Sequence, residues 1–449
     1  MGRRSTHGGS HLPRVLYFAV SGLGREALEL YEPPTLLRLM DEGSWCDLPS
    51  TNPPLEPPAW MSMHSGANSG EHGVFGLFSM RDPEEYGATR SSPYLSSIGQ
   101  MRCLRFWERA AMSGMQVVVR DMMMSLPRLE NRSDVGFVAL DDPSILGGSP
   151  ADQRVPDVSR RRRGGAGCFS DAMWSLGRKC IPYSDLALDR SIDLLCLGMH
   201  ELDGVLHAYG LSSPEARAVV AVMDDLIGLC VAAAGDDTVS LLVSDHGVAE
   251  YDGCFSVPCF LERRGWMVRE QGRIDFDRTQ VYPTCCGDPS RVDWEFGLYA
   301  NTRGRQSRGI VAPEDAAELL RVVADALQEE YGFECCANRE YYRGPLAHCG
   351  PDLLIHVGEQ RLVPLSTYNA AVEITLGSIA NHSSFGISAA VGPCAAVAPC
   401  NGDDVAPFML RALGVPVEPM PLLVDDALAK TPPGGGSIVE RLRILGHLN

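Results

Sequence analysis

The chain has 449 residues, of which 45% are hydrophobic, and its formal net charge is -18. This length and apolar content allow a large buried core and exclude disorder of the whole chain. The negative charge argues against nonspecific binding to nucleic acid polymers or anionic lipid, because long-range repulsion keeps polyanions away. No apolar run reaches the roughly 18 residues that a membrane span needs. A small anionic substrate would therefore need local cations, and we expect no membrane association.

The 15 cysteines are scattered along the chain. No apolar stretch near the start resembles a signal peptide, which argues against a secreted protein stabilised by disulfides. We therefore expect reduced thiols and a cytoplasmic location. Cys285 and Cys286 are adjacent and lack the Cys-x-x-Cys spacing of a zinc site, so we expect ordinary core or loop thiols there.

The first predicted elements follow a polar leader. Residues 1–13 are expected to be disordered, with order beginning at Arg14. Residues 15–20 form a continuous apolar run that ends at Ser21, as is typical of a strand buried on both faces of a parallel sheet. A helix is predicted next, over residues 34–42.

Three further apolar strands are predicted, over residues 116–119, 192–198 and 239–244, with a helix at 106–112 before the first of them. Strands that alternate with helices indicate a three-layer α/β/α fold around a mainly parallel sheet. Ligands bind at the carboxyl ends of the strands in such sheets, so the turns that follow these strands are where we expect the chemistry.

The domain organisation is predicted from the places where this alternation stops. Residues 254–347, with a predicted helix at 313–330, are expected to form a cap or insertion within a core domain of residues 14–430. Residues 431–449 are expected to form a Gly-rich flexible link and a short C-terminal helix. The Arg-rich run at 159–163 is expected to be a solvated loop, with an anion clamp as the alternative.

Candidate metal ligands lie at three separate places in the sequence. Asp203 and His207 are four residues apart just after a predicted strand, so on a helix they share one face and can bind one ion. Asp245 and His246 follow another predicted strand, immediately before a glycine. His382 stands in a loop before a further apolar run. Because each position lies at a predicted strand end, we expect the three to meet.

Several longer motifs accompany these residues. They are Pro-Pro-Leu-Glu-Pro-Pro-Ala-Trp at 53–60, Gly-Glu-His-Gly-Val-Phe-Gly at 70–76 and Leu-Tyr-Ala-Asn-Thr-Arg-Gly-Arg at 298–305. Together with the candidate ligands they resemble the type I phosphodiesterase/nucleotide pyrophosphatase branch of the alkaline phosphatase superfamily. The resemblance covers nearly the whole chain and implies the alkaline-phosphatase-like fold.

In that family two metal ions, usually zinc, flank the substrate phosphate, and a Thr or Ser between them attacks phosphorus. The resemblance implies that Asp203, His207 and His382 hold one ion. It implies that Asp245 and His246 hold the other, together with an Asp at the end of the first strand and the oxygen of the nucleophile.

At those last two positions we expect Ser21 and Met61 in this chain. A thioether has no proton to lose, so Met61 cannot act as the nucleophile. The second site would keep only two protein ligands, too few for an ordinary tetrahedral zinc site. We therefore predict one zinc ion rather than two.

Neighbouring residues offer alternatives for the missing group. Ser62 is adjacent to Met61 but would point about 100° away around a helix axis, and Ser21 would have to reach across from the strand end. His64 is a candidate to replace the missing polar group in the pocket. The helix start at Trp60 offers backbone N–H groups to an anion.

These observations favour an enzyme that acts on a phosphate, sulfate or related ester. Direct transfer of the group to water or to an acceptor requires positioning and charge stabilisation but no protein nucleophile. The expected substrate is a small anionic ester or a nucleotide-like molecule. The alternatives are a catalytically inactive binding protein and an ordinary phosphodiesterase rescued by Ser62 or Ser21.

Overall fold

The computed structural model describes nine segments of the chain, namely residues 14–76, 103–125, 137–140, 165–270, 273–284, 297–356, 362–365, 372–393 and 397–417. The expected leader at 1–13, the Arg-rich run at 159–163 and the C-terminal segment at 431–449 lie outside these residues, as do Cys285 and Cys286.

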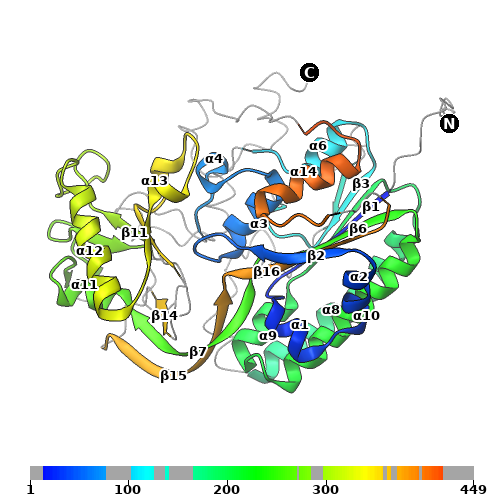
Figure 1. Ribbon diagram of the computed structural model, residues 1–449, viewed down its shortest axis with the longest axis horizontal. Coiled ribbons are helices and arrows are strands. Elements are labelled where there is room, and N and C mark those ends of the chain that lie inside the picture. Colours follow the sequence, from blue (N-terminus) through cyan, green and yellow to red (C-terminus); the bar gives the residue numbers. More distant parts are fainter. Residues whose placement is uncertain are drawn as a thin grey trace, which may run out of the picture.

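A seven-stranded sheet with the order β2-β16-β6-β1-β5-β3-β4 organises the larger part of the molecule (Figure 1). Its strands are β1 (Arg14–Val20), β2 (Ser44–Pro49), β3 (Val117–Arg120), β4 (Phe137–Leu140), β5 (Leu194–Met199), β6 (Thr238–Ser244) and β16 (Phe385–Val391). Strand β1 pairs in parallel with β5 and β6, and β16 is antiparallel to both of its neighbours. The predicted α/β fold with a mainly parallel sheet is confirmed.

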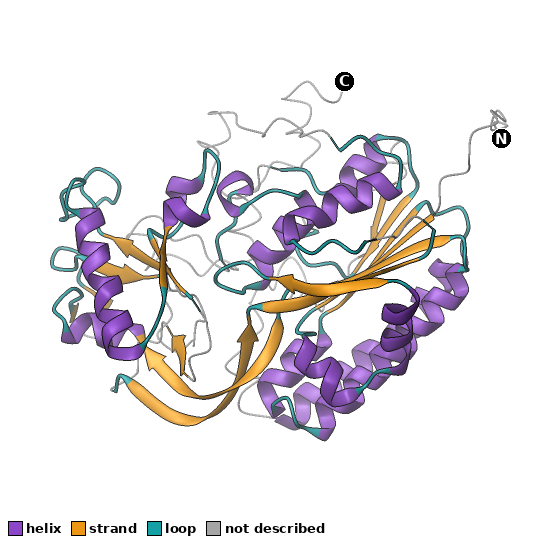
Figure 2. Cartoon of the chain, viewed as in Figure 1, coloured by secondary structure: helices purple, strands orange, loops and turns teal. Residues whose placement is uncertain are grey.

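Helices cover both faces of this sheet (Figure 2). On one face lie α1 (Arg25–Tyr31), α2 (Pro34–Glu42), α8 (Gly165–Leu188), α9 (Glu201–Tyr209) and α10 (Pro214–Ala234). On the other lie α3 (Glu56–Ser65), α4 (Ser69–His72), α6 (Phe106–Met112) and α14 (Gly402–Ala412). Side chains alternate along a strand, so Phe18 of β1 packs in one apolar core while Tyr17 and Ala19 pack in the other. This double burial explains the continuous apolar run.

Strand β7 (Gly247–Ser256) leads from the core into a smaller unit, and β15 (Ile374–Ser383) returns antiparallel to it. The short strand β14 (Leu362–Leu365) pairs in parallel with β7. The smaller unit contains a four-stranded sheet with the order β10-β11-β13-β12 and its own apolar core. Its elements are α11 (Val257–Arg263), β8 (Arg269–Glu270), β9 (Arg273–Ile274), β10 (Val281–Pro283), β11 (Gly297–Ala300), α12 (Ala316–Tyr331), β12 (Cys335–Ala337), α13 (Asn338–Tyr341), the 3-10 helix η2 (Ala347–Cys349) and β13 (Leu353–Ile355).

A disulfide joins Cys46 of β2 to Cys400, two residues before α14, with 5.9 Å between their Cα atoms. The expectation of reduced thiols is therefore wrong for this pair. The sequence could not indicate it, because the two residues are 354 positions apart and meet only in the folded chain. Within the described residues, no helix is both long and apolar enough to cross a membrane.

Candidate metal centre

The candidate ligands meet at the carboxyl ends of the central strands. Strand β1 lies between β5 and β6 in the sheet. Ser21 follows β1, Asp203 lies near the start of the helix after β5, and Asp245 follows β6. Parallel neighbours end at the same edge of a sheet, so the order of the strands alone brings these residues together.

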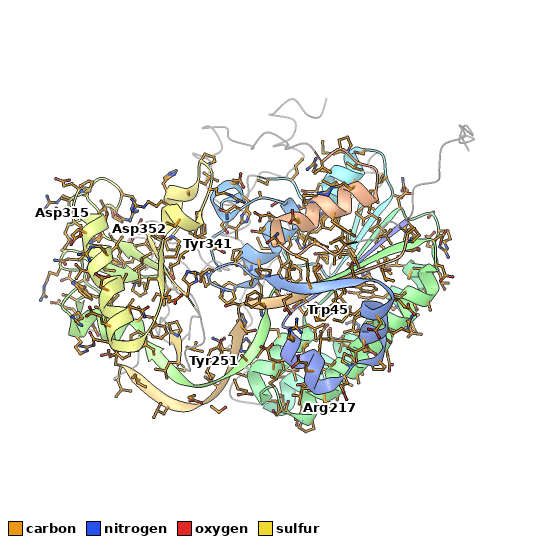
Figure 3. All side chains as sticks on the ribbon, viewed as in Figure 1. Trp45, Arg217, Tyr251, Asp315, Tyr341 and Asp352 are labelled. Atoms are coloured by element: carbon orange, nitrogen blue, oxygen red, sulfur yellow. A yellow bond between two sulfur atoms is a disulfide. The ribbon has the colours of Figure 1, made fainter. Side chains whose placement is uncertain are left out.

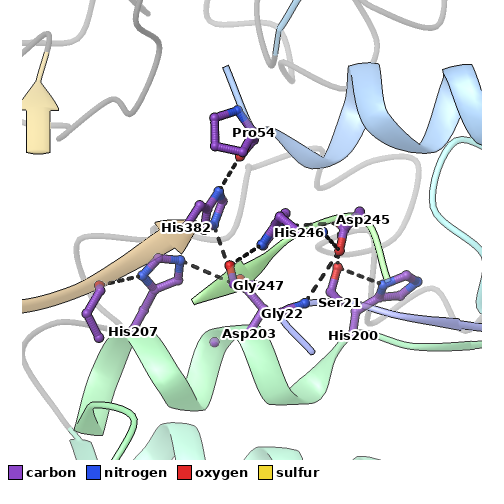
Figure 4. A network of polar contacts seen from close by, with 12 residues as sticks. Ser21, Gly22, Pro54, His200, Asp203, His207, Asp245, His246, Gly247 and His382 are labelled. Atoms are coloured by element: carbon purple, nitrogen blue, oxygen red, sulfur yellow. Dashed lines mark hydrogen bonds and ion pairs between the residues drawn. The ribbon is translucent and has the colours of Figure 1, made fainter. Parts of the chain in front are cut away.

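Asp203 lies between two histidines (Figure 4). Its Oδ1 is 3.3 Å from Nε2 of His207, one turn later on α9, and 3.4 Å from Nε2 of His382, on β15. The predicted i,i+4 spacing places the first pair, and the return of β15 along β7 supplies the third residue. One carboxylate and two imidazoles are a donor set that zinc accepts, with a position left for a substrate or water.

Backbone carbonyls fix the orientation of each imidazole. Nδ1 of His207 lies 3.1 Å from the carbonyl oxygen of Ala380, and Nδ1 of His382 lies 2.6 Å from that of Pro54. A carbonyl only accepts hydrogen bonds, so Nδ1 of each ring carries a proton, and Nε2, which faces Asp203, is the atom that would bind a metal ion in place of a proton. This arrangement is the usual outer support of a metal-binding histidine.

Several atoms directed into the centre are buried without a well-formed hydrogen bond among the described residues. They are Oδ1 of Asp203, Nε2 of His382 and Nε2 of His246. Unsatisfied buried polar atoms are costly, and bound metal would satisfy them. The residues present therefore fit a divalent cation.

The charges of the centre point the same way. Burial alone would raise the pKa of Asp203, but His207 and His382 outweigh it and hold the pKa well below its usual range. Burial alone would lower the pKa of His382, but the carboxylate of Asp203, which faces its Nε2, raises it to about 9. The centre thus favours a positive charge next to Asp203, which a metal ion would provide.

Ser21 is bound to the second pair of candidate ligands. Its hydroxyl donates to Oδ2 of Asp245 at 2.8 Å and is 3.3 Å from Nδ1 of His200. Oδ1 of Asp245 accepts the backbone N–H of His246 at 3.1 Å. Ser21 is 1% exposed, so the structure brings it to the centre but does not present its hydroxyl to an incoming substrate.

Burial affects the second pair of candidate ligands in opposite ways. It raises the pKa of Asp245 well above its usual range, helped by the negative charge of Glu56. It lowers the pKa of His246 well below its usual range, helped by the charge of His382. Both shifts favour the uncharged forms, because neither side chain has a counter-charge that compensates for its loss of water.

The residues predicted around the nucleophile position lie outside the group of candidate ligands. Met61 is completely buried in the apolar core between the sheet and α3. The rings of Trp60 and His64 stack in the same core with centroids 5.3 Å apart, and burial lowers the pKa of His64 well below its usual range. Ser62 Oγ lies 3.1 Å from Nε2 of His72. None of these four residues belongs to the groups of candidate ligands found within the described residues.

Glu56 is a candidate ligand that the sequence reasoning missed. It is the first residue of α3, and its carboxylate lies within 4.8 Å of donor atoms of both His246 and His382. Proline is well tolerated in the first turn of a helix, so Pro57 and Pro58 place the helix start at Glu56. The signal was an acidic residue at a proline-marked helix start, which a search for Thr or Ser passes over.

The smaller unit touches the loop that supports the centre. The backbone N–H of Asn52 donates to the hydroxyl of Tyr341, labelled in Figure 3, at 2.5 Å. Nδ2 of Asn52 lies 3.2 Å from Nδ1 of His356. The neighbouring Pro54 holds His382, as described above, and the hydroxyl of Tyr251 donates to the carbonyl of His382 at 2.9 Å. The smaller unit can therefore influence the position of a candidate ligand.

Gly22 sets the space available to Asp203, which leads to a first prediction. Gly22 has φ +82, and an added Cβ would lie 3.1 Å from Cα of Asp203. Gly22→Ala should cost about 1–2 kcal/mol for the left-handed backbone and should also displace Asp203 and weaken zinc binding. Gly114→Ala is the matched control, since its φ is +85 and an added Cβ meets no described atom within 4 Å. Denaturant unfolding and zinc titration would separate the effects; equal zinc affinity in both variants would contradict the prediction.

The chain is similar to known proteins in both sequence and structure. The sequence profile of the type I phosphodiesterase/nucleotide pyrophosphatase family matches residues 15–369. No curated protein matches the sequence.

Among solved structures, an inactive threonine-to-alanine variant of murine ectonucleotide pyrophosphatase/phosphodiesterase 5 in complex with AMP is similar, with a TM-score of 0.58 and 13% identity. The similarity covers 91% of this chain and 97% of the murine one. Phosphonoacetate hydrolase from Sinorhizobium meliloti, in complex with phosphonoformate, has a TM-score of 0.56 and 14% identity, over 90% of this chain and 96% of that one. At such identities these structures support the shared fold. The match over most of the sequence, on the fold and ligand arrangement described above, shows that the chain belongs to the type I phosphodiesterase/nucleotide pyrophosphatase family.

Proposed function

We propose that this protein is a metal-dependent enzyme that hydrolyses or transfers the phosphate, phosphonate or sulfate group of a small anionic ester. The observation that carries the proposal is the placement of Asp203 Oδ1 at 3.3 and 3.4 Å from Nε2 of His207 and His382. A zinc ion held by these three residues would supply Lewis-acid stabilisation of the negative charge on the substrate oxygens. The position of this centre at the carboxyl edge of the sheet is the usual place for a ligand in such folds.

We propose further that the group passes directly to water or to an acceptor. Ser21 donates its hydroxyl proton to Asp245, and Ser62 lies against His72. Both side chains are buried, so neither hydroxyl is presented to an incoming ester, which counts against the phosphodiesterase rescued by either serine. The chain's own residues would fix the place where the ester binds. Asp203 would offset the positive charge of the metal ion, and backbone carbonyls hold His207 and His382 in position.

The relatives guide the choice of substrate. The murine structure holds AMP, and the bacterial hydrolase holds phosphonoformate or, in another complex, phosphonoacetate. AMP and the two phosphonates are all small molecules with a phosphoryl or phosphonyl group. We propose a substrate of this kind, either a nucleotide-like ester or a small phosphonate.

The stereochemistry at phosphorus tests direct transfer. The zinc-loaded protein would first be assayed with an aryl phosphodiester, an aryl phosphate, an aryl sulfate, AMP and phosphonoacetate. If a phosphate ester reacts, its chiral phosphorothioate analogue should give inversion, because a single displacement inverts phosphorus and two successive displacements retain its configuration. Retention would overturn direct transfer. Binding of AMP in calorimetry without turnover of any ester would instead support the inactive binding protein.

A further inference from the structure

We propose that Glu56 is a metal ligand, and that with Asp245 and His246 it holds a second divalent cation beside the ion of Asp203, His207 and His382. This inference deepens the proposed function, because it adds a cation to the same centre, but it can be tested without turnover. It also differs from the expectation from sequence, which left the second position with two protein ligands.

The position of Glu56 is the first support. As the first residue of α3, it follows the loop in which Pro54 accepts the hydrogen bond from His382. Its carboxylate oxygen and the ligand atoms of His246 and His382 all lie within 4.8 Å of one another. Two ligand atoms of one ion are separated by about 3–4 Å when each lies about 2.0–2.2 Å from it, so the Glu56 carboxylate is close to the spacing that a shared ion requires.

The second support is His246, which is completely buried. Its Nδ1 lies 3.0 Å from the carbonyl oxygen of Gly247, which places the proton on Nδ1 and leaves the lone pair on Nε2. That Nε2 has no hydrogen-bond partner in the described part of the chain. Oδ2 of Asp245 is 3.5 Å away, a separation that fits two ligands of one ion.

His382 cannot complete both positions. Its ring stacks on that of His246 with centroids 3.7 Å apart, but it offers a single Nε2, which faces Asp203 at 3.4 Å. Its Nδ1 is already used by Pro54. The first ion therefore takes His382, and the second needs another donor, which Glu56 provides.

Charge is the third support. Glu56, Asp203 and Asp245 are three carboxylates that lie beside His246 or His382. No Lys or Arg of the described residues forms an ion pair with any of the three. Carboxylates are costly to bury, and one divalent cation at the first position leaves Glu56 and Asp245 beside His246 without a cation of their own. A second cation bound by Glu56 would offset their charge.

Metal stoichiometry tests the inference. The full chain would be stripped of metal, titrated with Co(II) while its visible absorbance is recorded, and analysed for bound zinc by mass spectrometry after reloading. We expect two equivalents in the wild type. Glu56→Gln should keep one equivalent and lose the second, or bind it about 100-fold more weakly or worse, because a charged ligand becomes a neutral amide.

Glu26→Gln is the matched control, since Glu26 also lies in the first turn of a helix but is exposed to solvent. It should retain both equivalents. Thermal unfolding of the metal-free proteins checks that Glu56→Gln folds like the wild type. One equivalent in the wild type, or two in Glu56→Gln, would overturn the inference. Two equivalents in a wild type that turns over no ester would refute the proposed function alone, so the two failures are distinguishable.

Discussion

Replacing Asp203 by asparagine should abolish tight metal binding at the first position. The two histidine Nε2 atoms lie 3.3 and 3.4 Å from Oδ1 of Asp203, so this carboxylate is the charged member of the ligand set. An amide oxygen is a much weaker zinc ligand, and two histidines alone do not form a stable site. We expect Asp203→Asn to lose about one equivalent of zinc and, if the proposed function holds, its turnover as well.

The loss should also appear as a loss of stabilisation by zinc. A ligand present at 100 to 1,000 times its dissociation constant raises the free energy of unfolding by about 3–4 kcal/mol. Thermal unfolding with and without zinc should show this increment for the wild type and little of it for Asp203→Asn. Asp225→Asn is a suitable control, since Asp225 is an exposed residue of α10. An identical zinc content and an identical shift in the two variants would refute the assignment of Asp203.

Removing Glu108 should destabilise the fold by about 3–5 kcal/mol, because it leaves the charge of Arg105 buried without a counter-charge. Both side chains are only 1% exposed, and a guanidinium nitrogen of Arg105 contacts Oε1 of Glu108. Oε2 of Glu108 accepts the backbone N–H of Arg105 at 2.9 Å at the start of α6. Helix α6 contacts α3 and α14, so unfolding of α6 would weaken the packing of α3, whose first residue is Glu56.

Denaturant unfolding of Glu108→Ala would measure this cost. The control is Glu42→Ala, which breaks the exposed pair between Arg38 and Glu42 and should cost less than about 1 kcal/mol. The double variant Arg105→Met with Glu108→Met removes both charges and should be much closer to the wild type than Glu108→Ala. A similar cost for Glu108→Ala and Glu42→Ala would contradict the assigned role of the buried pair.

The candidate ligands other than Glu56 were predictable because most of their patterns are local. Asp203 and His207 are one helical turn apart, and Asp245 with His246 directly follows an apolar strand. Parallel strands order such residues along one edge of a sheet without further information. Their convergence with His382 was expected from the strand ends, and the family resemblance implied which residues share an ion; the structure brings His382 to Asp203 and His246.

The region around α3 was not predictable in the same way. Met61 is five residues after Glu56, so the two side chains are about 140° apart around the helix axis. When the helix packs its apolar side against the sheet, Met61, Trp60 and His64 enter the core. The start of the helix then points toward the histidines and brings Glu56 to them. Which side of a helix faces the sheet depends on packing between the layers. A local sequence motif contains no information about that packing.

The sequence by itself therefore determined the alternation of strands and helices, the edge of the sheet where the candidate ligands meet, and five of those candidates, Asp203, His207, Asp245, His246 and His382. Hydrophobic periodicity and the ends of strands are local properties of the sequence, so they do not depend on the tertiary structure. Only the tertiary structure decided that Glu56 rather than Met61 faces the centre, that Ser21 is held by Asp245, and that Cys46 meets Cys400. Each of these contacts joins distant segments, and the packing of the layers against the sheet selects them.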